Sequence, residues 1–198
     1  GKAGSIAAAS DILNISSPSI SAAITQLEDE FGLTLFIREH AKGELVLLLN
    51  NDIEIIHPDW LTELVSLQVR KKVGAVGCKL LFPNDTIQHA GIIMGMGGVA
   101  GHPHKCIHAK EYGYFGRANL LQNLSGCTAA CLLVKRSVYD EVGGLNENEL
   151  KIAFNDVDLC LKIRKAGHLI TYTPHAALYH HESISRGYED TPEKIEAE

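Results

Sequence analysis

The chain has 198 residues, of which 45% are hydrophobic and 21% are charged, which indicates one or two globular domains with an apolar core. No apolar run approaches the roughly 18 residues of a membrane-spanning helix, and a net charge of −6 argues against nucleic-acid binding. The first ten residues lack the layout of a signal peptide, so we expect a cytoplasmic protein. An odd number of irregularly spaced cysteines indicates reduced thiols, not a disulfide framework: Cys78, Cys106, Cys127, Cys131 and Cys160.

Residues 1–43 are rich in Ala, Ser and Ile and predict two helices. Residues 5–14 place apolar side chains on one helical face. After a short break, Ser17 and Pro18 are typical of a helix start, and Gly32 is typical of a helix end. A stripe of apolar residues between these two points predicts one buried helix face: Ile20, Ile24, Leu27 and Phe31.

The segment "GSIAAASDILNISSPSISAAITQLEDEFGLTLFIREHAKG" resembles the LysR-type transcription regulators, which implies a helix-turn-helix. Two differences from that family argue against DNA binding. The family's first helix is absent, and the presumed recognition helix has no Lys or Arg between Ser17 and Gln26. We therefore favour a small packed helical hairpin for residues 1–43 and keep a DNA-binding regulator as the alternative.

The first strand of the second part is predicted at residues 45–49, which are all apolar and run into Asn50-Asn51-Asp52. A continuous apolar run is typical of a strand buried on both faces of a parallel sheet, and ligands bind beyond the carboxyl ends of such strands. A helix beginning at Pro58 and a strand at residues 73–82 would complete a strand–helix–strand unit. Asp52 is a candidate ligand-binding residue, although Asp is also common in turns.

Further along, residues 154–167 predict a helix capped by Asn155, ended by Gly167 and buried through Leu159 and Ile163. Asp156 and Asp158 in its first turn are either functional or complement the helix dipole. The segment "SGCTAACLLVKRS", residues 125–137, predicts a strand preceded by small residues, which suit either a close approach to a sugar or core packing.

Five segments resemble the family-2 glycosyltransferases, which have the GT-A fold: "LLLNNDIEIIHPDWL", "GAVGCKLLFPNDTIQHAGIIMG", "YFGRANLLQNLSGCTAACLLVKRSVYDEVGGLNE", "AFNDVDLCLKIRKAGHLITYTP" and "ALYHHESISRG". Together they cover residues 42–187 in the family's order, although Asn50 and Asn155 stand where the family often has acids. The resemblance implies a sugar transfer from a nucleotide-sugar to an acceptor glycan, with a divalent ion, Mn²⁺ or Mg²⁺, on the donor diphosphate.

The same resemblance assigns roles to individual residues. Asp52, in the donor-binding Asn50-Asn51-Asp52 segment, is implied as a metal ligand, and Asp156 as the general base that deprotonates the acceptor hydroxyl. His180 or His181, after the last strand, is implied as a further metal ligand or diphosphate contact. Arg186, in a polar segment that is either a flap or a frayed tail, is implied as a phosphate contact.

The segment "GHPHKCIH", residues 101–108, has His102, His104, Cys106 and His108 at alternate positions. Four ligands alternating on a single strand cannot all point at one ion, so we expect no zinc site there.

In the GT-A family the nucleoside-binding units precede the strand that ends on the metal-binding Asp, and here residues 1–43 occupy that place. We therefore expect an α/β fold with a partial GT-A-like mixed sheet flanked by helices in residues 44–198, preceded by the helix-turn-helix segment 1–43. The simplest explanation is a chimera with little or no activity. The alternatives are an active, metal-dependent glycosyltransferase with a rebuilt or dimer-shared donor site, and a DNA-binding regulator. An apolar strand at an open sheet edge predicts a homodimer.

Overall fold

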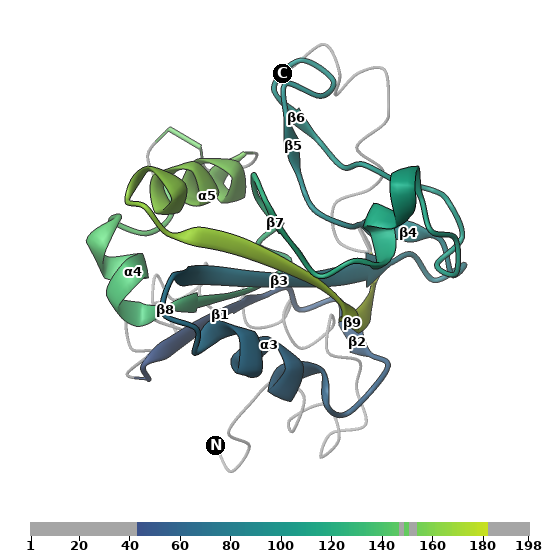
Figure 1. Cartoon of the computed structure of the whole chain (residues 1–198), viewed down its shortest axis with the longest axis horizontal. Coiled ribbons are helices and arrows are strands. Elements are labelled where there is room, and N and C mark those ends of the chain that lie inside the picture. Colours follow the sequence, from purple (N-terminus) through teal and green to yellow (C-terminus); the bar gives the residue numbers. More distant parts are fainter. Residues whose placement is uncertain (1–42, 147–148, 151–153, 182–198) are drawn as a thin grey trace, which may run out of the picture. The chain divides into compact units, whose positions relative to one another are not determined.

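The computed structural model describes residues 43–146, 149–150 and 154–181 (Figure 1). The predicted helix-turn-helix segment and Arg186 lie outside these described residues. Nearly all described residues belong to one compact unit, residues 42–180. Its elements are β1 (Leu45–Leu49), β2 (Ile53–Ile55), α3 (Trp60–Gln68), β3 (Val73–Leu81), β4 (Ile87–His89), β5 (Ile93–Met94), β6 (Ala100–Gly101), η2 (Tyr114–Asn119), β7 (Gln122–Leu124), β8 (Cys131–Lys135), α4 (Arg136–Glu141), α5 (Asn155–Lys165) and β9 (Leu169–His180).

The unit is built on a mixed sheet with the strand order β1-β8-β3-β9-β2, extended by β4 next to β3 and β7 next to β9. Among the described strands of this sheet, only the β3–β9 pair is parallel, and the remaining pairs are antiparallel. A separate hairpin of β5 and β6 stands away from the sheet (Figure 1). The predicted α/β class with a mixed sheet flanked by helices is confirmed.

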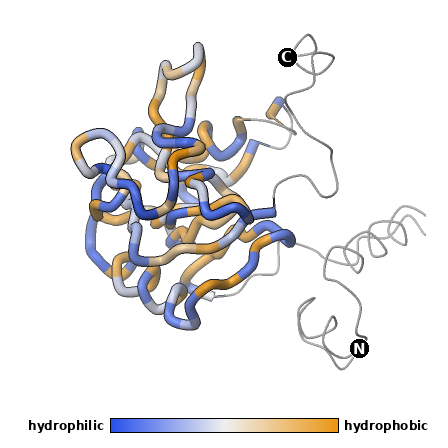
Figure 2. Tube along the Cα trace, turned by 90° about the vertical axis from the view of Figure 1, so that its right-hand side faces the viewer, coloured by the Kyte–Doolittle hydropathy of each residue, from blue (hydrophilic) through white to orange (hydrophobic). Residues whose placement is uncertain are grey.

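Helices cover both faces of the sheet, α3 on one and α5 on the other (Figure 1). Trp60, Leu64 and Leu67 of α3 pack in one apolar cluster with Val76 and Leu80 of β3. The opposite cluster contains Leu159 and Ile163 of α5 together with sheet residues that point the other way, including Ala75 and Leu132. Hydrophobic stretches are interspersed with hydrophilic ones along the trace (Figure 2), and the central strand β3 is buried along its whole length, as two covered faces of one sheet require.

The prediction that residues 45–49 form a strand buried on both faces of a parallel sheet is wrong. β1 lies at the end of the sheet, pairs antiparallel with β8, and is half-buried, with Leu49 43% exposed. It contacts both clusters, Leu47 on one face and Leu48 on the other, which explains the unbroken apolar run. The two strands of the predicted strand–helix–strand unit, β1 and β3, run in the same direction. They are not neighbours in the sheet, because β8 lies between them.

The two longer helices differ from the prediction at their starts. α3 begins at Trp60, two residues after Pro58. α5 begins at Asn155, which therefore does not cap it; the preceding Phe154 has a left-handed backbone with φ 60°, and no side chain caps the helix. The predicted end is confirmed, since Gly167 has φ +91°, a value that favours glycine.

The segment around His102 and His104 is not the single strand that its alternating pattern suggested. β6 ends at Gly101, and the chain then forms turns in which His104 and Cys106 have positive φ values of 65° and 70°. Pro103 cannot donate a ladder hydrogen bond, which explains why the strand stops before it. All five cysteines are free thiols, as predicted.

Candidate active site

Three chain segments meet at the sheet edge where β1 and β9 end and β8 begins. Asn50 follows β1, His180 is the last residue of β9, and residues 128–130 lead into β8. The Asn50 amide donates to the carbonyl of Ala130 at 2.9 Å, which extends the β1–β8 ladder by one step. β1, β3 and β9 run in the same direction, so their carboxyl ends lie at this one edge.

His180 is the centre of a polar cluster at this edge. Its Nε2 lies 3.1 Å from the Asn50 side-chain nitrogen and 3.1 Å from Asp52 Oδ1. Its Nδ1 lies 2.7 Å from Gln88 Oε1, on β4, which pairs with β3. The imidazole is buried, so these polar contacts fix its orientation.

The contacts of His180 define which ring nitrogen carries the proton and which one accepts. Gln88 Oε1 only accepts hydrogen bonds, so Nδ1 carries the proton and donates to it. In the neutral ring, Nε2 therefore accepts from the Asn50 side-chain amide at 3.1 Å, and it lies equally close to a carboxylate oxygen of Asp52. Nε2 and the Asp52 oxygen are both electron-rich, so a cation that replaced the Asn50 amide at Nε2 would bind between them.

Asp156 lies at the start of α5 and faces the same three-residue segment. Its Oδ2 accepts from the Ala129 amide at 3.2 Å, and its Oδ1 accepts from the Val157 amide at 2.8 Å. The helix N-terminus stabilises the carboxylate charge. Because Ala129 is adjacent to Ala130, which bonds Asn50, the structure brings Asp156 and the Asn50–Asp52 segment to two sides of one short backbone stretch.

His89 belongs to this cluster, although the sequence did not single it out. Its Nε2 accepts from the amides of Gly91 at 3.2 Å and Thr128 at 3.4 Å, so its proton lies on Nδ1. That proton is donated to His102 Nδ1 at 2.8 Å, and the two rings pack edge to face. The signal in the sequence was weak, because His89 follows Ile87 in a short strand whose polar residues resemble those of a surface strand.

Burial lowers the pKa of His89 well below its usual value near 6.5, and the neighbouring His102 and His180 lower it further. The folded state therefore favours neutral His89, while the unfolded chain takes up a proton once the pH falls below about 6.5. The contribution of neutral His89 to the free energy of unfolding is therefore present above about pH 6.5 and is lost as the pH falls below it. We expect the urea midpoint to fall between pH 7.5 and 5.5, and to fall less in His89→Gln.

The control for this pH dependence is His175→Gln, a change at an exposed histidine of β9. That variant should keep the pH dependence of the native protein. If the urea midpoint fell by the same amount with pH in His89→Gln and in the native protein, His89 would not be the cause of the pH dependence.

The remaining predicted site residues lie as follows. Asn51 is exposed in the turn between β1 and β2, and His181 follows the end of β9. The two histidines were expected after the strand, but His180 is within it. Asp158 lies in the first turn of α5, where it complements the helix dipole, and it forms an ion pair with Lys162 at 2.7 Å on the same helix. Among the described residues, no three His, Cys, Asp or Glu side chains form a group that could hold a metal, and Asp52 and His180 form a pair only.

Comparisons with known proteins divide the chain in two. Residues 1–48 match the family described as bacterial regulatory helix-turn-helix protein, lysR family. The chain is 58% identical over 154 residues to the uncharacterized protein y4gI of Sinorhizobium fredii and 43% identical over 156 residues to the O-antigen biosynthesis protein RfbC of Myxococcus xanthus. Each match covers 78% of this chain but only 17% and 12% of the relatives' own lengths.

One further relative and one solved structure are named as glycosyltransferases. The chain is 42% identical over 60 residues, 30% of this chain and 19% of the relative, to the N-acetylglucosaminyl-diphospho-decaprenol L-rhamnosyltransferase of Mycobacterium tuberculosis. A mannosyltransferase from Pyrobaculum calidifontis, solved with GDP-Man and Mn²⁺, superposes with a TM-score of 0.50 at 18% identity, over 77% of this chain and 36% of that one. This chain joins a LysR-type helix-turn-helix match to a glycosyltransferase-like part. The solved neighbour shows that this second part has a GT-A-like fold.

Proposed function

We propose that residues 44–181 are the metal- and acceptor-side half of an inverting family-2 glycosyltransferase, which binds a divalent ion and the diphosphate of a nucleotide-sugar. The observation that carries this proposal is the Asp52–His180 pair, 3.1 Å apart at the carboxyl-end edge of the sheet. Two adjacent ligands of an octahedral ion with bonds of about 2.1 Å lie roughly 3 Å apart. The GT-A-like fold and the rhamnosyltransferase relative support the same reading.

The ion, Mn²⁺ or Mg²⁺, would be held by Asp52 and His180, with diphosphate oxygens completing its shell. Its chemistry there is to neutralise the charge that develops on the leaving diphosphate. Asp156 would accept the proton of the acceptor hydroxyl while that oxygen bonds to the anomeric carbon and the bond to the diphosphate breaks. The Ala129 amide that donates to Asp156 would hold the carboxylate in place during this transfer.

The proposal includes a chimeric origin with little or no sugar transfer. The LysR-type match runs through residue 48, so it reaches into β1, the strand that carries Asn50 at its end. The stretch in which the resemblance to glycosyltransferases places nucleoside-binding units therefore has a regulator-like sequence. Residues 1–43 are therefore not expected to contact the base and ribose of a donor, and we expect this chain to bind a donor weakly, through its diphosphate.

Calorimetric titration with UDP, GDP and dTDP, each with and without Mn²⁺, tests this proposal. We expect binding only with Mn²⁺, with a Kd of roughly 0.1–1 mM and little preference among the bases, because the diphosphate supplies the contacts. Release of free nucleotide from UDP-, GDP- or dTDP-sugars is expected at no more than the rate without protein. No heat with any nucleotide would contradict the metal–diphosphate site, whereas enzymatic turnover would favour the active, dimer-shared alternative.

The dimer belongs to the proposal through the position of β1. It lies at the end of the sheet path formed by the described strands and is apolar along its whole length. Light scattering is expected to give twice the chain mass, and a monomer at high concentration would contradict this. Binding of duplex DNA that weakens as salt is raised would support the regulator alternative, which the LysR-type match favours.

A further inference from the structure

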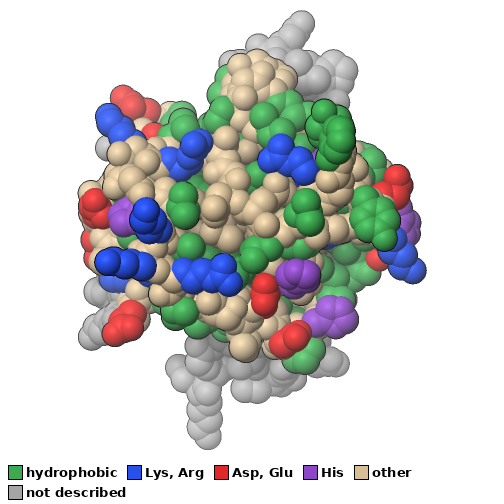
Figure 3. All heavy atoms as spheres, in the orientation of Figure 1, with side chains coloured by type: hydrophobic (Ala, Val, Ile, Leu, Met, Phe, Trp, Pro, Cys, Tyr) green, Lys and Arg blue, Asp and Glu red, His purple; other side chains and the backbone are tan. Residues whose placement is uncertain are grey.

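We propose that the opposite edge of the sheet, where β3 and β9 begin, docks on an anionic membrane surface. Six cationic residues lie on the three chain segments that meet there, in a chain whose net charge is −6 and which has 18 Lys and Arg residues in all. We name this set the basic edge: Arg70, Lys71, Lys72, Lys135, Arg164 and Lys165. Figure 3 shows Lys and Arg side chains gathered on the side of the molecule where β3 begins.

Hydrogen bonds join the three segments that carry these cations. The Leu169 amide donates to the carbonyl of Lys72 at 2.9 Å, which connects the chain after α5 to the start of β3. Lys135 Nζ donates to the carbonyl of Arg70 at 2.8 Å, which brings in the end of β8. Among the described residues, no member of the basic edge forms an ion pair, and the acidic side chains of this region pair elsewhere, Asp140 with Arg136 and Glu141 with His168. Five of the six residues are exposed, and Lys135 is half-buried.

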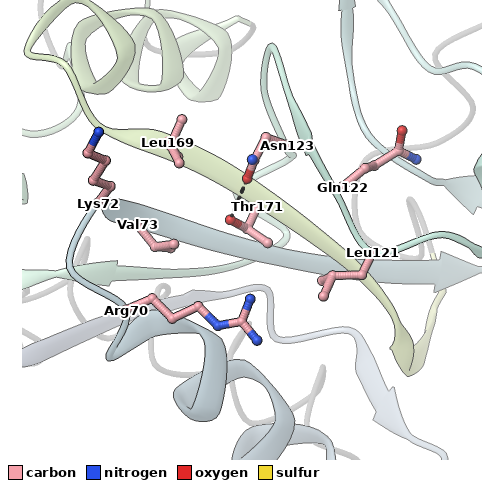
Figure 4. A pocket seen from close by; sticks show the side chains of 8 residues that line it. All are labelled: Arg70, Lys72, Val73, Leu121, Gln122, Asn123, Leu169 and Thr171. Carbon is pink, nitrogen blue, oxygen red and sulfur yellow. Dashed lines mark hydrogen bonds between the residues drawn. The ribbon is translucent and has the colours of Figure 1, made fainter.

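A pocket of about 280 Å³ opens within the basic edge (Figure 4). Arg70 and Lys72 lie at one end and Leu121 lies at the other. Asn123 and Thr171 are bonded to each other on its wall, with Oγ1 donating to Oδ1 at 3.0 Å. Cations beside polar side chains suit the phosphate of a lipid headgroup.

Exposed apolar side chains lie among the cations. Val69, next to Arg70, is 69% exposed, and Leu121 and Leu169 of the pocket wall are 41% and 37% exposed. Such residues gain free energy by entering the acyl boundary of a bilayer, where basic residues meet anionic headgroups. A nucleic acid would use the same cations but offers these aliphatic side chains nothing comparable, and the basic edge has no aromatic side chain for base stacking. These features favour a membrane over a nucleic acid.

The basic edge and the candidate active site lie at opposite ends of the same strands. β3 has nine residues, which at about 3.3 Å per residue separates its ends by about 30 Å. Docking through the basic edge therefore leaves the Asp52–His180 pair open to water. The inference does not depend on the proposed transferase function, and the two can fail separately.

Co-sedimentation of the full chain with vesicles tests the inference. We expect binding to vesicles of phosphatidylcholine with 30% phosphatidylglycerol and none to pure phosphatidylcholine, with at least tenfold weaker binding in 0.5 M than in 0.1 M NaCl. Arg70→Glu/Lys72→Glu should reduce the binding at least tenfold. Lys105→Glu/Lys110→Glu, which changes the charge equally at exposed lysines elsewhere, should reduce it less than twofold. Val69→Ser tests the apolar contribution and should reduce binding about threefold.

Circular dichroism of each variant checks that it is folded, and the salt dependence of the native chain provides a test that needs no variant. Equal binding to both vesicle types, or no binding to either, would overturn the inference. So would equal losses in the two charge-reversal variants, since only net charge would then matter. Binding to duplex DNA that is lost in Arg70→Glu/Lys72→Glu, with no vesicle binding, would assign the basic edge to nucleic acid instead.

Discussion

Asp52→Asn is expected to lower the affinity for a nucleotide diphosphate in the presence of Mn²⁺ at least about 100-fold, to below detection by calorimetry. The substitution keeps the shape of the side chain but removes the negative charge that a hard cation requires. It also places a second amide, beside that of Asn50, about 3.1 Å from His180 Nε2, where its N–H can donate to the imidazole and oppose a cation. One change therefore removes one proposed ligand and weakens the other.

A matched control is Asp59→Asn, which removes the same charge from an exposed residue before α3. This variant should bind the nucleotide as the native protein does. His180→Gln is a second, independent test, and its affinity for the nucleotide diphosphate is expected to fall by a similar factor. If Asp52→Asn binds a nucleotide diphosphate with native affinity in Mn²⁺, Asp52 is not a ligand and the proposed site is wrong.

Gly77→Ala is expected to reduce the free energy of unfolding by about 2–3 kcal/mol, the largest stability effect that we predict for a single added methyl group. A Cβ atom at Gly77 would lie 2.4 Å from the Cβ and 2.7 Å from the Sγ of Cys127. The position of a Cβ is fixed by the backbone, so no rotation of Cys127 relieves the first contact. The backbone of β3 or of residues 126–128 must therefore shift within a buried cluster.

Urea denaturation monitored by circular dichroism measures this effect. The double variant Gly77→Ala/Cys127→Gly removes the opposing Cβ and should be more stable than the sum of the two single losses predicts. Gly43→Ala, where the added Cβ meets no atom closer than 3.4 Å, should change the stability by less than about 0.5 kcal/mol. Simple additivity in the double variant would show that the contact with Cys127 is not the cause.

The sequence predicted the elements that carry local signals. The strand after residue 73 and the end of α5 at Gly167 are confirmed, because a buried apolar run and a glycine with positive φ both act over a few residues. The neighbours of β1 could not be predicted in this way. β8 enters the sheet more than 80 residues later, and pairing between distant strands leaves no periodicity in either one.

The candidate site shows the same division. Asp52 and Asp156 stood out because each follows or begins a regular element in the family's order. His89 and Gln88 did not, since their part in the site depends on the β3–β4 pairing and on a turn that brings Thr128 to the imidazole. A short polar strand beside a long apolar one carries no sign of burial in the sequence, whereas in the fold both side chains are buried.

Residues 128–130 have a mechanical consequence. One peptide stretch bonds His89 through Thr128, Asp156 through Ala129 and Asn50 through Ala130. A displacement of this stretch by less than an ångström would reposition all three partners at once. Binding of a ligand on one side of residues 128–130 should therefore shift the bonded side chains on the other side without any larger rearrangement.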